Sequence, residues 1–557
     1  MHRLFRTKPV DHLLAGSARP EHRLRRTLGP VQLTGLGIGA IVGAGIFSTV
    51  GTAAAGGSQH IGAGPALTIS FVLVALACGL TALCYAEFAA RVPASGSAYT
   101  YAYVSFGELF AWVIGWALLM EYSIGNIYVA FSWSGYFTNL LDAMGLHLPE
   151  WLTINYRSAA AAHAANTPGE GLTAWATAPL IGGRRIILDL PAFAINVLIT
   201  ALCYVGVRES RNASNAMVVV KLAIIALVIA VGIAHVDIDH WTPFMPNGFG
   251  GVMAGASAVF FAYIGFDAVS TLAEESRDPQ RDLPRGMVLS LVVCTAVYIA
   301  LALVLTGMVP YHQLDVSDPL AEVFALTGVK WMLLLVSIAA VVAMTSVMLV
   351  FQLGQPRIWM SMSRDGLLPK PFARIHPRYR TPGFSTIVTG LVVGVPILFT
   401  DEAFILDFTS IGTLFAFVLV CGGVLLMPRR ERGPSGFHLP YINGRWIVPA
   451  LLLLAVLLVH LGLPGYFGDL FHPAGRHGDQ RIPLLVYWAL CAALAVLSFV
   501  HRWSLIPVLG LASCCYLLTG MAVSNWKWFG TWLLIGLACY FAYGHRHSRL
   551  ARRANPV

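Results

Sequence analysis

The chain has 557 residues, of which 57% are hydrophobic and only 11% are charged, and its mean hydropathy is +0.70. A soluble globular domain has about 25% charged residues, so the composition excludes a soluble protein and indicates an all-α protein that crosses the lipid bilayer many times. The formal net charge of +9 comes from basic residues in short loops and at the chain ends. That pattern is the orientation signal of a membrane protein and does not indicate nucleic-acid binding.

The predicted spans begin after a basic tail at residues 1–30, which lacks the apolar core of a cleavable signal peptide. We predict fourteen spans, with twelve as the alternative if two C-terminal spans are fused or dropped. In chain order they are 31–55, 67–88, 102–131, 190–207, 216–235, 251–272, 286–309, 331–362, 384–399, 404–427, 446–463, 482–500, 505–523 and 528–543. A polar, irregular outside loop is expected at 145–189, and we assign it no role.

The distribution of Lys and Arg predicts the orientation. Basic clusters lie in the tail at 1–30, in the loops at 277–285 and 364–380, and in the tail at 544–557. We therefore expect both termini in the cytoplasm and the protein in the plasma or inner membrane. Arg184 and Arg185, which lie in the outside loop, depart from this bias.

The nine cysteines all lie in apolar segments, and none has a His partner at metal-ligand spacing. We expect small buried apolar residues, without disulfides, a metal site or a cofactor.

The first span contains four glycines in the nine residues from Gly37 to Gly45. Each glycine costs a helix up to about 1 kcal/mol relative to alanine. Broken backbone inside a membrane is tolerated where it lines a cavity or meets protein, so this span is a candidate broken helix with a ligand site. The alternative is a Gly39-xxx-Gly43 face for close helix packing.

Two charged residues lie within later spans. Glu121, near the middle of the third span, could face the substrate side chain and attract a cationic one, or could be satisfied by serine and tyrosine neighbours. Lys221 lies about one and a half turns into the fifth span and by itself fits a snorkelling lysine. If it is buried instead, desolvation disfavours its charged form, so its protonation could change during a transport cycle.

The sixth span contains Gly265 and Asp267 near mid-membrane. Aspartate at the centre of a spanning helix costs about 2.5–3.5 kcal/mol, so we expect a second break here, with Asp267 capping the resumed half-helix. Four spans separate the two broken ones, which gives a five-helix repeat whose two copies insert with opposite topology. Met344, Thr345 and Ser346, on the eighth span, lie at about substrate depth and are candidates for the pocket wall.

Two broken helices define which ligand could bind. Free N–H groups at a half-helix N-terminus suit a carboxylate, and free carbonyls at a C-terminus suit an ammonium group. An α-amino acid satisfies both, whereas an inorganic anion or a sugar would use only part of the site. A channel is less well supported because nothing resembles a filter repeat or a ring of charges.

The chain resembles the cationic amino acid transporter family of the amino acid–polyamine–organocation superfamily over nearly its whole length. The residues that carry the resemblance are those at 37–47, 260–267, 274–275, 278–279, 283–284, 354–357, 363–369 and 540–544. The resemblance implies a ten-helix core of two inverted repeats with additional C-terminal helices, and secondary active transport of amino acids.

The resemblance also implies roles for particular residues. The substrate carboxylate is expected at the backbone of Gly43, Ala44 and Gly45, with Ile41 nearby. Ala44 replaces a hydroxyl residue of some relatives, so one side-chain hydrogen bond is expected to be missing. The substrate ammonium is expected at the carbonyls of three residues of the sixth span, Phe261, Ala262 and Ile264. Lys221 matches a lysine that stands where sodium-coupled relatives hold their ion, between the first, fifth and eighth spans, which favours proton coupling.

The sequence therefore predicts a proton-coupled importer of cationic or neutral L-amino acids, with an exchanger or a non-transporting sensor as alternatives. Paired catalytic carboxylates, a nucleophile elbow and a metal cluster are all missing from the sequence pattern, so an enzyme is not expected. The oligomeric state is left open. The predicted units are a tail at 1–30, a core at 31–427 with repeats 31–236 and 251–427, a linker at 428–445, additional helices at 446–543 and a tail at 544–557.

Overall fold

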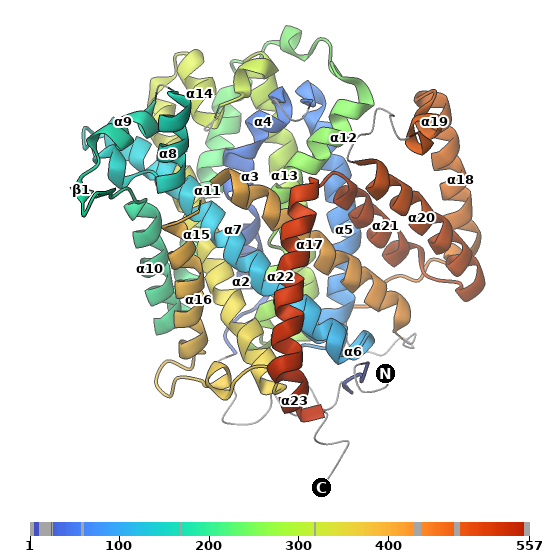
Figure 1. Ribbon diagram of the computed structural model, residues 1–557. Coiled ribbons are helices and arrows are strands. Elements are labelled where there is room, and N and C mark those ends of the chain that lie inside the picture. Colours follow the sequence, from blue (N-terminus) through green and yellow to red (C-terminus); the bar gives the residue numbers. More distant parts are fainter. Residues whose placement is uncertain are drawn as a thin grey trace.

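The computed structural model describes residues 5–9, 24, 26–56, 61–167, 169–316, 319–400, 402–427, 436–472 and 480–550, and these are overwhelmingly helical (Figure 1). All fourteen predicted spans coincide with helix, which confirms the all-α membrane fold. In the described chain nine helices are long and apolar enough to cross a bilayer, or ten if one bent pair is a single span. Three shorter apolar helices, α2, α10 and α16, account for further predicted spans.

The elements of the first predicted repeat begin with a helix that is interrupted after Ile41. They are α2 (Pro30–Ile41), α3 (Ala44–Phe47), α4 (Thr49–Ala55), η2 (Gly64–Ala66), α5 (Leu67–Arg91), α6 (Ala98–Ser105), α7 (Glu108–Ala143), α10 (Leu190–Val205) and α11 (Val207–Ile233). The third span starts later than predicted. The turn at Gly107, with φ +98°, separates α6 from α7, and a left-handed backbone of this kind favours glycine.

The second predicted repeat also begins with an interrupted helix. Its elements are η4 (Ile238–Trp241), α12 (Gly248–Val259), η5 (Phe260–Tyr263), η6 (Asp267–Glu275), α13 (Pro279–Met308), η7 (Tyr311–Leu314), α14 (Pro319–Leu326), α15 (Lys330–Arg364), η8 (Lys370–Ala373), α16 (Gly383–Ile397) and α17 (Glu402–Leu426). The long helices α7 and α15 pack against each other through the centre of the bundle.

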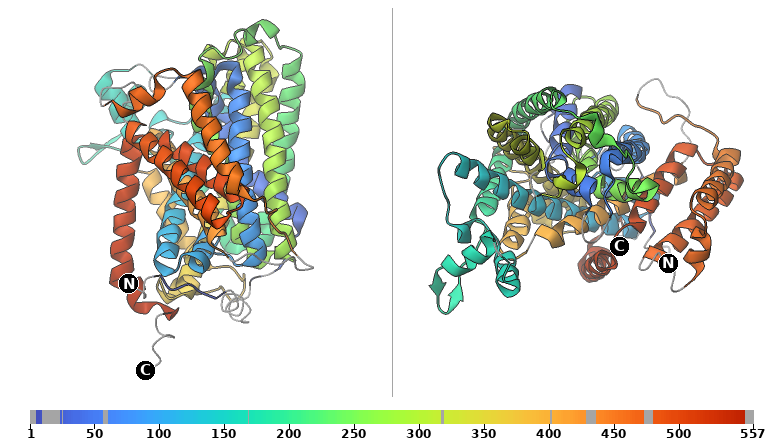
Figure 2. Two further views of the ribbon diagram at one scale, coloured as in Figure 1. Left: turned by 90° about the vertical axis from the view of Figure 1, so that its right-hand side faces the viewer. Right: turned by 90° about the horizontal axis from the view of Figure 1, so that it is seen from above.

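The C-terminal helices lie beside this core. They are α18 (Gly444–Gly462), α19 (Tyr466–Phe471), α20 (Arg481–His501), α21 (Leu505–Thr519), α22 (Val523–Cys539), the π-helical turn η10 (Tyr540–Gly544) and α23 (His545–His547). Seen from above, α18–α21 form one side of the molecule (Figure 2). The axes of α21 and α22 differ by 113°, and α21 packs on α5 and α17 while α22 packs on α7 and α17.

The predicted outside loop is not irregular. It contains η3 (Glu150–Leu152), α8 (Tyr156–Ala165), α9 (Glu170–Thr177) and a hairpin of β1 (Leu180–Ile181) and β2 (Arg184–Arg185). Alanine-rich sequence favours helix, and the side chain of Asn155 caps α8 by accepting a hydrogen bond from Ser158 N at 2.8 Å. The prediction of an irregular loop was therefore wrong because it ignored this local helix propensity.

Candidate functional site

The first break lies where α2 ends. Val42 has an extended backbone with φ −79° and ψ 97°, and helix resumes at Ala44, the first residue of α3. A Cβ atom on Gly43 would lie 2.4 Å from Val347 Cγ2 of α15, so the break can approach α15 because Gly43 has no side chain. The N–H groups of Ala44 and Gly45 are at the start of α3 and lack helical acceptors.

The same glycine run also supports close helix packing. A Cβ atom on Gly37 would lie 2.6 Å from Ser290 Oγ of α13. The run therefore contains a break at Gly43 and a close helix contact at Gly37, which is not one of the two residues of the Gly39-xxx-Gly43 face that the sequence offered as the alternative.

The second break separates η5 from η6, as predicted. Ile264 is extended, with φ −62° and ψ 138°, and Gly265 has φ +121°, a conformation that favours glycine. A Cβ atom on Gly265 would lie 3.0 Å from the carbonyl of Ala40 in α2. Asp267 is the first residue of η6 and does not cap it, so the predicted capping role was wrong.

The two breaks lie next to each other. A Cβ atom on Gly45 would lie 2.4 Å from Ala262 Cα, so the predicted carboxylate-binding and ammonium-binding backbones are in contact. Tyr298 of α13 bridges them, because its hydroxyl lies 2.8 Å from the carbonyl oxygen of Ile41 and 2.9 Å from that of Ala262. A phenol has one O–H donor, so the two carbonyls share it.

Lys221 of α11 is fully buried and does not snorkel. Its Nζ donates to the carbonyl oxygens of Ile38, Gly39 and Val42 at 3.1, 3.2 and 2.7 Å. It also donates to Ser346 Oγ of α15 at 2.8 Å. No described carboxylate forms an ion pair with it. The ammonium therefore caps the broken end of α2 and joins three helices.

Met344 and Thr345 of α15, both predicted as residues of the pocket wall, differ in their surroundings. Met344 is fully buried and lies about one helical turn before Val347, which packs on the first break. Thr345 Oγ1 accepts a hydrogen bond from Trp133 Nε1 of α7 at 2.8 Å and donates to the carbonyl of Val341 at 2.7 Å. The hydroxyl of Thr345 is thus already used between α7 and α15.

Glu121 lies in α7 close to Gly412 of α17 and is buried. Neither of its carboxylate oxygens has a hydrogen-bond partner among the described residues, although Thr413 lies nearby. Asp267 interacts with it electrostatically, and Asp267 Oδ2 accepts a hydrogen bond from Tyr122 at 3.0 Å. Two buried carboxylates therefore face one region between α7, η6 and α17.

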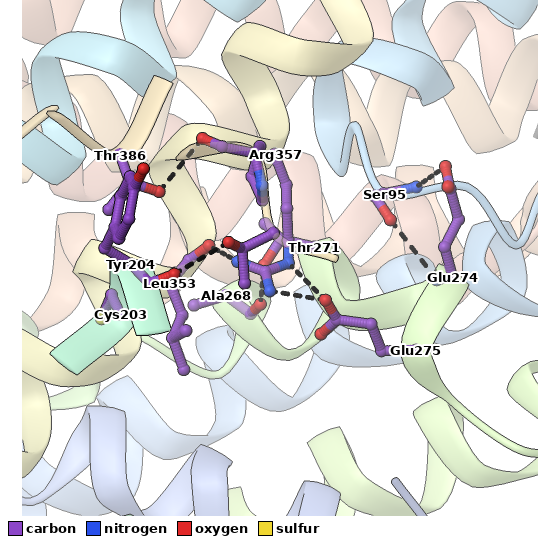
Figure 3. Close-up of polar contacts among 12 residues, drawn as sticks. Ser95, Cys203, Tyr204, Ala268, Thr271, Glu274, Glu275, Leu353, Arg357 and Thr386 are labelled. Atoms are coloured by element: carbon purple, nitrogen blue, oxygen red, sulfur yellow. Dashed lines mark hydrogen bonds and ion pairs between the residues drawn. The ribbon is translucent and has the colours of Figure 1, made fainter. Parts of the chain in front are cut away.

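Two ion pairs join η6 to α15 on the side of the second break that leads to α13, and Figure 3 shows the one between Glu275 and Arg357. Arg357 is buried and donates to Glu275 Oε1 from Nε at 3.2 Å and from Nη2 at 2.5 Å, and it also donates to the carbonyl of Leu353. Arg364 Nη1 lies 2.9 and 2.8 Å from the two oxygens of Glu274. Glu274 and Glu275 thus each form an ion pair with an arginine of α15.

The chain ends are tied to this same region. Leu28 N donates to the carbonyl of Glu275 at 3.0 Å, Lys8 pairs with Asp365 at the end of α15, and Arg549 N donates to the Asp365 carbonyl at 3.0 Å. Both described chain ends therefore lie at one end of the bundle (Figure 1), and their contacts with Glu275 and Asp365 place them next to the ion pairs.

Several residues of the site were not predicted. Tyr298 was missed, and so was Tyr128 of α7, whose ring meets that of Phe261 edge-on at 5.0 Å. Ser346 was named as a wall candidate, but the hydrogen bond that it accepts from Lys221 was not predicted. A tyrosine or serine inside an apolar span is the only local signal, and it does not identify the distant carbonyl or ring that it contacts.

Comparison with known proteins shows that the chain is similar to amino acid permeases. The sequence model of the amino acid permease family matches residues 28–484, and that of its C-terminal part matches residues 505–548. The branched-chain amino acid permease BcaP of Bacillus subtilis is 37% identical, with 98% of this chain and 99% of BcaP covered. The methylthioribose transporter of the same organism is 42% identical, with 84% and 94% covered. Cationic amino acid transporter 4 of Homo sapiens is 32% identical, with 100% and 92% covered.

Proposed function

Because the chain belongs to the amino acid permease family, as its resemblance to cationic amino acid transporters predicted, we propose that it imports an amino acid together with a proton by alternating access. It is a multi-pass membrane transporter and not an enzyme. The observation that carries the proposed coupling is the buried ammonium of Lys221, which joins α11 to α2 and α15 at the first break.

The proposed substrate site lies at the junction of the two breaks. The carboxylate of the amino acid meets the N–H groups of the first break at Gly43, Ala44 and Gly45, with Ile41 nearby. Its ammonium meets the carbonyls of the second break at Phe261, Ala262 and Ile264. The contact of Gly45 with Ala262 supports this assignment, because one small zwitterion can reach both backbones only if they lie together.

The side chain of the substrate is proposed to face Met344 and Thr345, with Glu121 as the group that would attract a cationic one. The relatives differ in what their names state: branched-chain amino acids, cationic amino acids and methylthioribose. We therefore propose a cationic or neutral L-amino acid as substrate, and methylthioribose belongs in any substrate panel as the competing candidate.

The hydrogen bonds that Lys221 donates support the proposed proton coupling. Its ammonium has three N–H donors and meets four acceptors, three of which are carbonyls of α2. A neutral amine keeps two donors and turns a lone pair toward carbonyl oxygens, which repel it. Loss of the proton therefore weakens the contact between α11 and α2, so protonation and the position of the broken helix are linked.

The proposed placement is the cytoplasmic membrane of the cell, with both termini inside. The two described chain ends lie together, which supports a common side, and the basic loops support the cytoplasmic one. The proposed units keep the predicted limits, with a core of two repeats at 31–236 and 251–427 and additional helices at 446–543.

The test is uptake of a labelled panel of amino acids and methylthioribose into proteoliposomes, with and without an inward proton gradient. Wild type and Lys221→Ala are compared. We expect gradient-stimulated uptake of at least one amino acid by wild type, and loss of this stimulation in Lys221→Ala while exchange with preloaded substrate continues.

Other results identify the alternatives. Uptake that ignores the proton gradient and needs sodium or a preloaded amino acid would replace proton symport by a sodium-coupled carrier or an exchanger. Binding of an amino acid without flux of any substrate would indicate a sensor.

A further inference from the structure

A long groove opens between α2, α11 and α13, away from the junction of the two breaks. Its volume is about 1110 Å³, and Gly35, Ile38 and Val218 contribute to its lining, with Leu289 and Val292 along α13. Leu289 and Val292 are exposed by 52% and 58%, on a helix that is apolar enough to cross the membrane. The groove therefore opens toward the region that lipid occupies.

One end of the groove is basic. Arg281 and Arg285 line it, are both exposed, and lie one turn apart on the face of α13 that continues through Leu289 to Val292. Among the residues that the structure describes, Arg281 has an ion pair only with Asp278, a long one of 3.8 Å between half-exposed groups. Arg285 has no ion pair or side-chain hydrogen bond with any residue that the structure describes.

The groove is long enough for a lipid head group and the adjoining part of its acyl chain. Arg285 and Val292 are seven residues apart, which corresponds to about 10 Å along a helix, and Arg281 adds about 6 Å. An apolar channel of this length with cationic groups at one end matches an acyl chain with an anionic head. Guanidinium groups bind phosphate oxygens in a forked geometry, and cytoplasmic basic pockets between spanning helices suit anionic lipids.

We propose that this groove binds one anionic phospholipid, with an acyl chain between α2, α11 and α13 and with its phosphate on Arg281 and Arg285. The site lies directly behind the contact made by Lys221. Ile38 lines the groove and its carbonyl accepts a hydrogen bond from Lys221, and Val218 precedes Lys221 by one turn of α11. An acyl chain bound here presses on α2 and α11, two of the three helices that Lys221 joins, and so supports their contact.

Binding of the lipid can be tested without measuring transport. A negative result would therefore overturn the lipid site and leave the proposed transport function untouched. Native mass spectrometry of the purified protein counts bound lipid during titration with phosphatidylglycerol or phosphatidylcholine. The double variant Arg281→Gln/Arg285→Gln is compared with Lys370→Gln/Arg374→Gln, which removes two charges from exposed residues after α15. Loss of each arginine is expected to weaken binding of an anionic lipid about fivefold. We therefore expect about 30-fold weaker retention of phosphatidylglycerol in the first variant and an unchanged level in the second.

An equal loss of phosphatidylglycerol in both double variants would indicate binding to diffuse surface charge and would overturn the site. Equal retention of phosphatidylcholine and phosphatidylglycerol by the wild-type protein would also overturn it. A second variant tests the chain. Val292→Trp fills the groove and is expected to release the lipid, whereas Leu458→Trp, which replaces an exposed leucine of α18, is expected to keep it. Retention of phosphatidylglycerol by Val292→Trp would show that the lipid binds only through its head and contradict the proposal.

Discussion

Arg357 and Lys221 are both buried cations, but their surroundings differ. Arg357 forms two hydrogen bonds with the carboxylate of Glu275. Lys221 meets only carbonyl oxygens and the hydroxyl of Ser346. A buried cation with a carboxylate partner is held in its charged form, whereas one held by neutral acceptors can lose its proton without leaving an opposite charge unpaired.

The comparison separates two roles. The ion pair between η6 and α15 holds one end of the bundle together, and its members depend on each other. The ammonium at the first break is held by neutral groups whose hydrogen bonds change with protonation. The first arrangement suits a structural closure and the second suits a switch, and the following substitutions test that distinction.

The largest effect is expected at the ion pair. Glu275→Gln leaves the buried guanidinium of Arg357 without its counter-charge, which costs about 3–5 kcal/mol. We expect a large fall in the apparent melting temperature of the detergent-purified protein. The double variant Glu275→Met/Arg357→Met removes both charges and should be more stable than either single variant. Additive losses in the double variant would show that the two residues are not coupled.

A smaller loss of stability is expected at Lys221. Lys221→Met keeps a side chain of similar length and removes a charge that has no carboxylate partner. The main loss is the hydrogen bond to the carbonyl oxygen of Val42, which contributes about 1 kcal/mol to the free energy of unfolding. The melting temperature should therefore fall far less than in Glu275→Gln. Lys527→Met, on the exposed surface of α22, is the control. A fall as large as that of Glu275→Gln would mean that Lys221 is primarily structural.

Ser346→Ala removes one of the four acceptors of Lys221 and keeps the three carbonyls. We expect gradient-driven uptake to fall about fivefold, which corresponds to about 1 kcal/mol for one hydrogen bond. The matched control is Ser513→Ala, because the hydroxyl of Ser513 bonds only within its own helix, to Gly510. Uptake equal to wild type would exclude Ser346 from the coupling site.

The smallest effect is expected at Tyr298. Tyr298→Phe removes the hydroxyl that the carbonyls of Ile41 and Ala262 share, while the ring remains in place. Because these carbonyls belong to the proposed substrate site, we expect KM to rise about threefold while the ratio of uptake with and without a proton gradient stays unchanged. A changed ratio with an unchanged KM would assign Tyr298 to coupling instead of substrate binding.

Much of the fold could be predicted from local features. The glycines around Gly43 and the Gly265–Asp267 pair mark both breaks, because glycine and charge are costly inside a spanning helix wherever they occur. The resemblance placed Lys221 between the first, fifth and eighth spans, where it lies, but its individual acceptors could not be predicted, since three of them are backbone groups about 180 residues away. The start of α7 was missed because it depends on the backbone conformation of Gly107, and the pairing of Glu275 with Arg357 depends on how η6 meets α15.

The most direct test of the central claim is the movement of the proton itself. Proteoliposomes with a pH-sensitive dye in the lumen receive a transported amino acid at equal pH on both sides, with the membrane potential clamped. The account predicts that the lumen acidifies as the amino acid enters through the wild-type protein and that Lys221→Met abolishes this acidification. Entry of the amino acid through the wild-type protein at constant luminal pH would contradict proton coupling through Lys221.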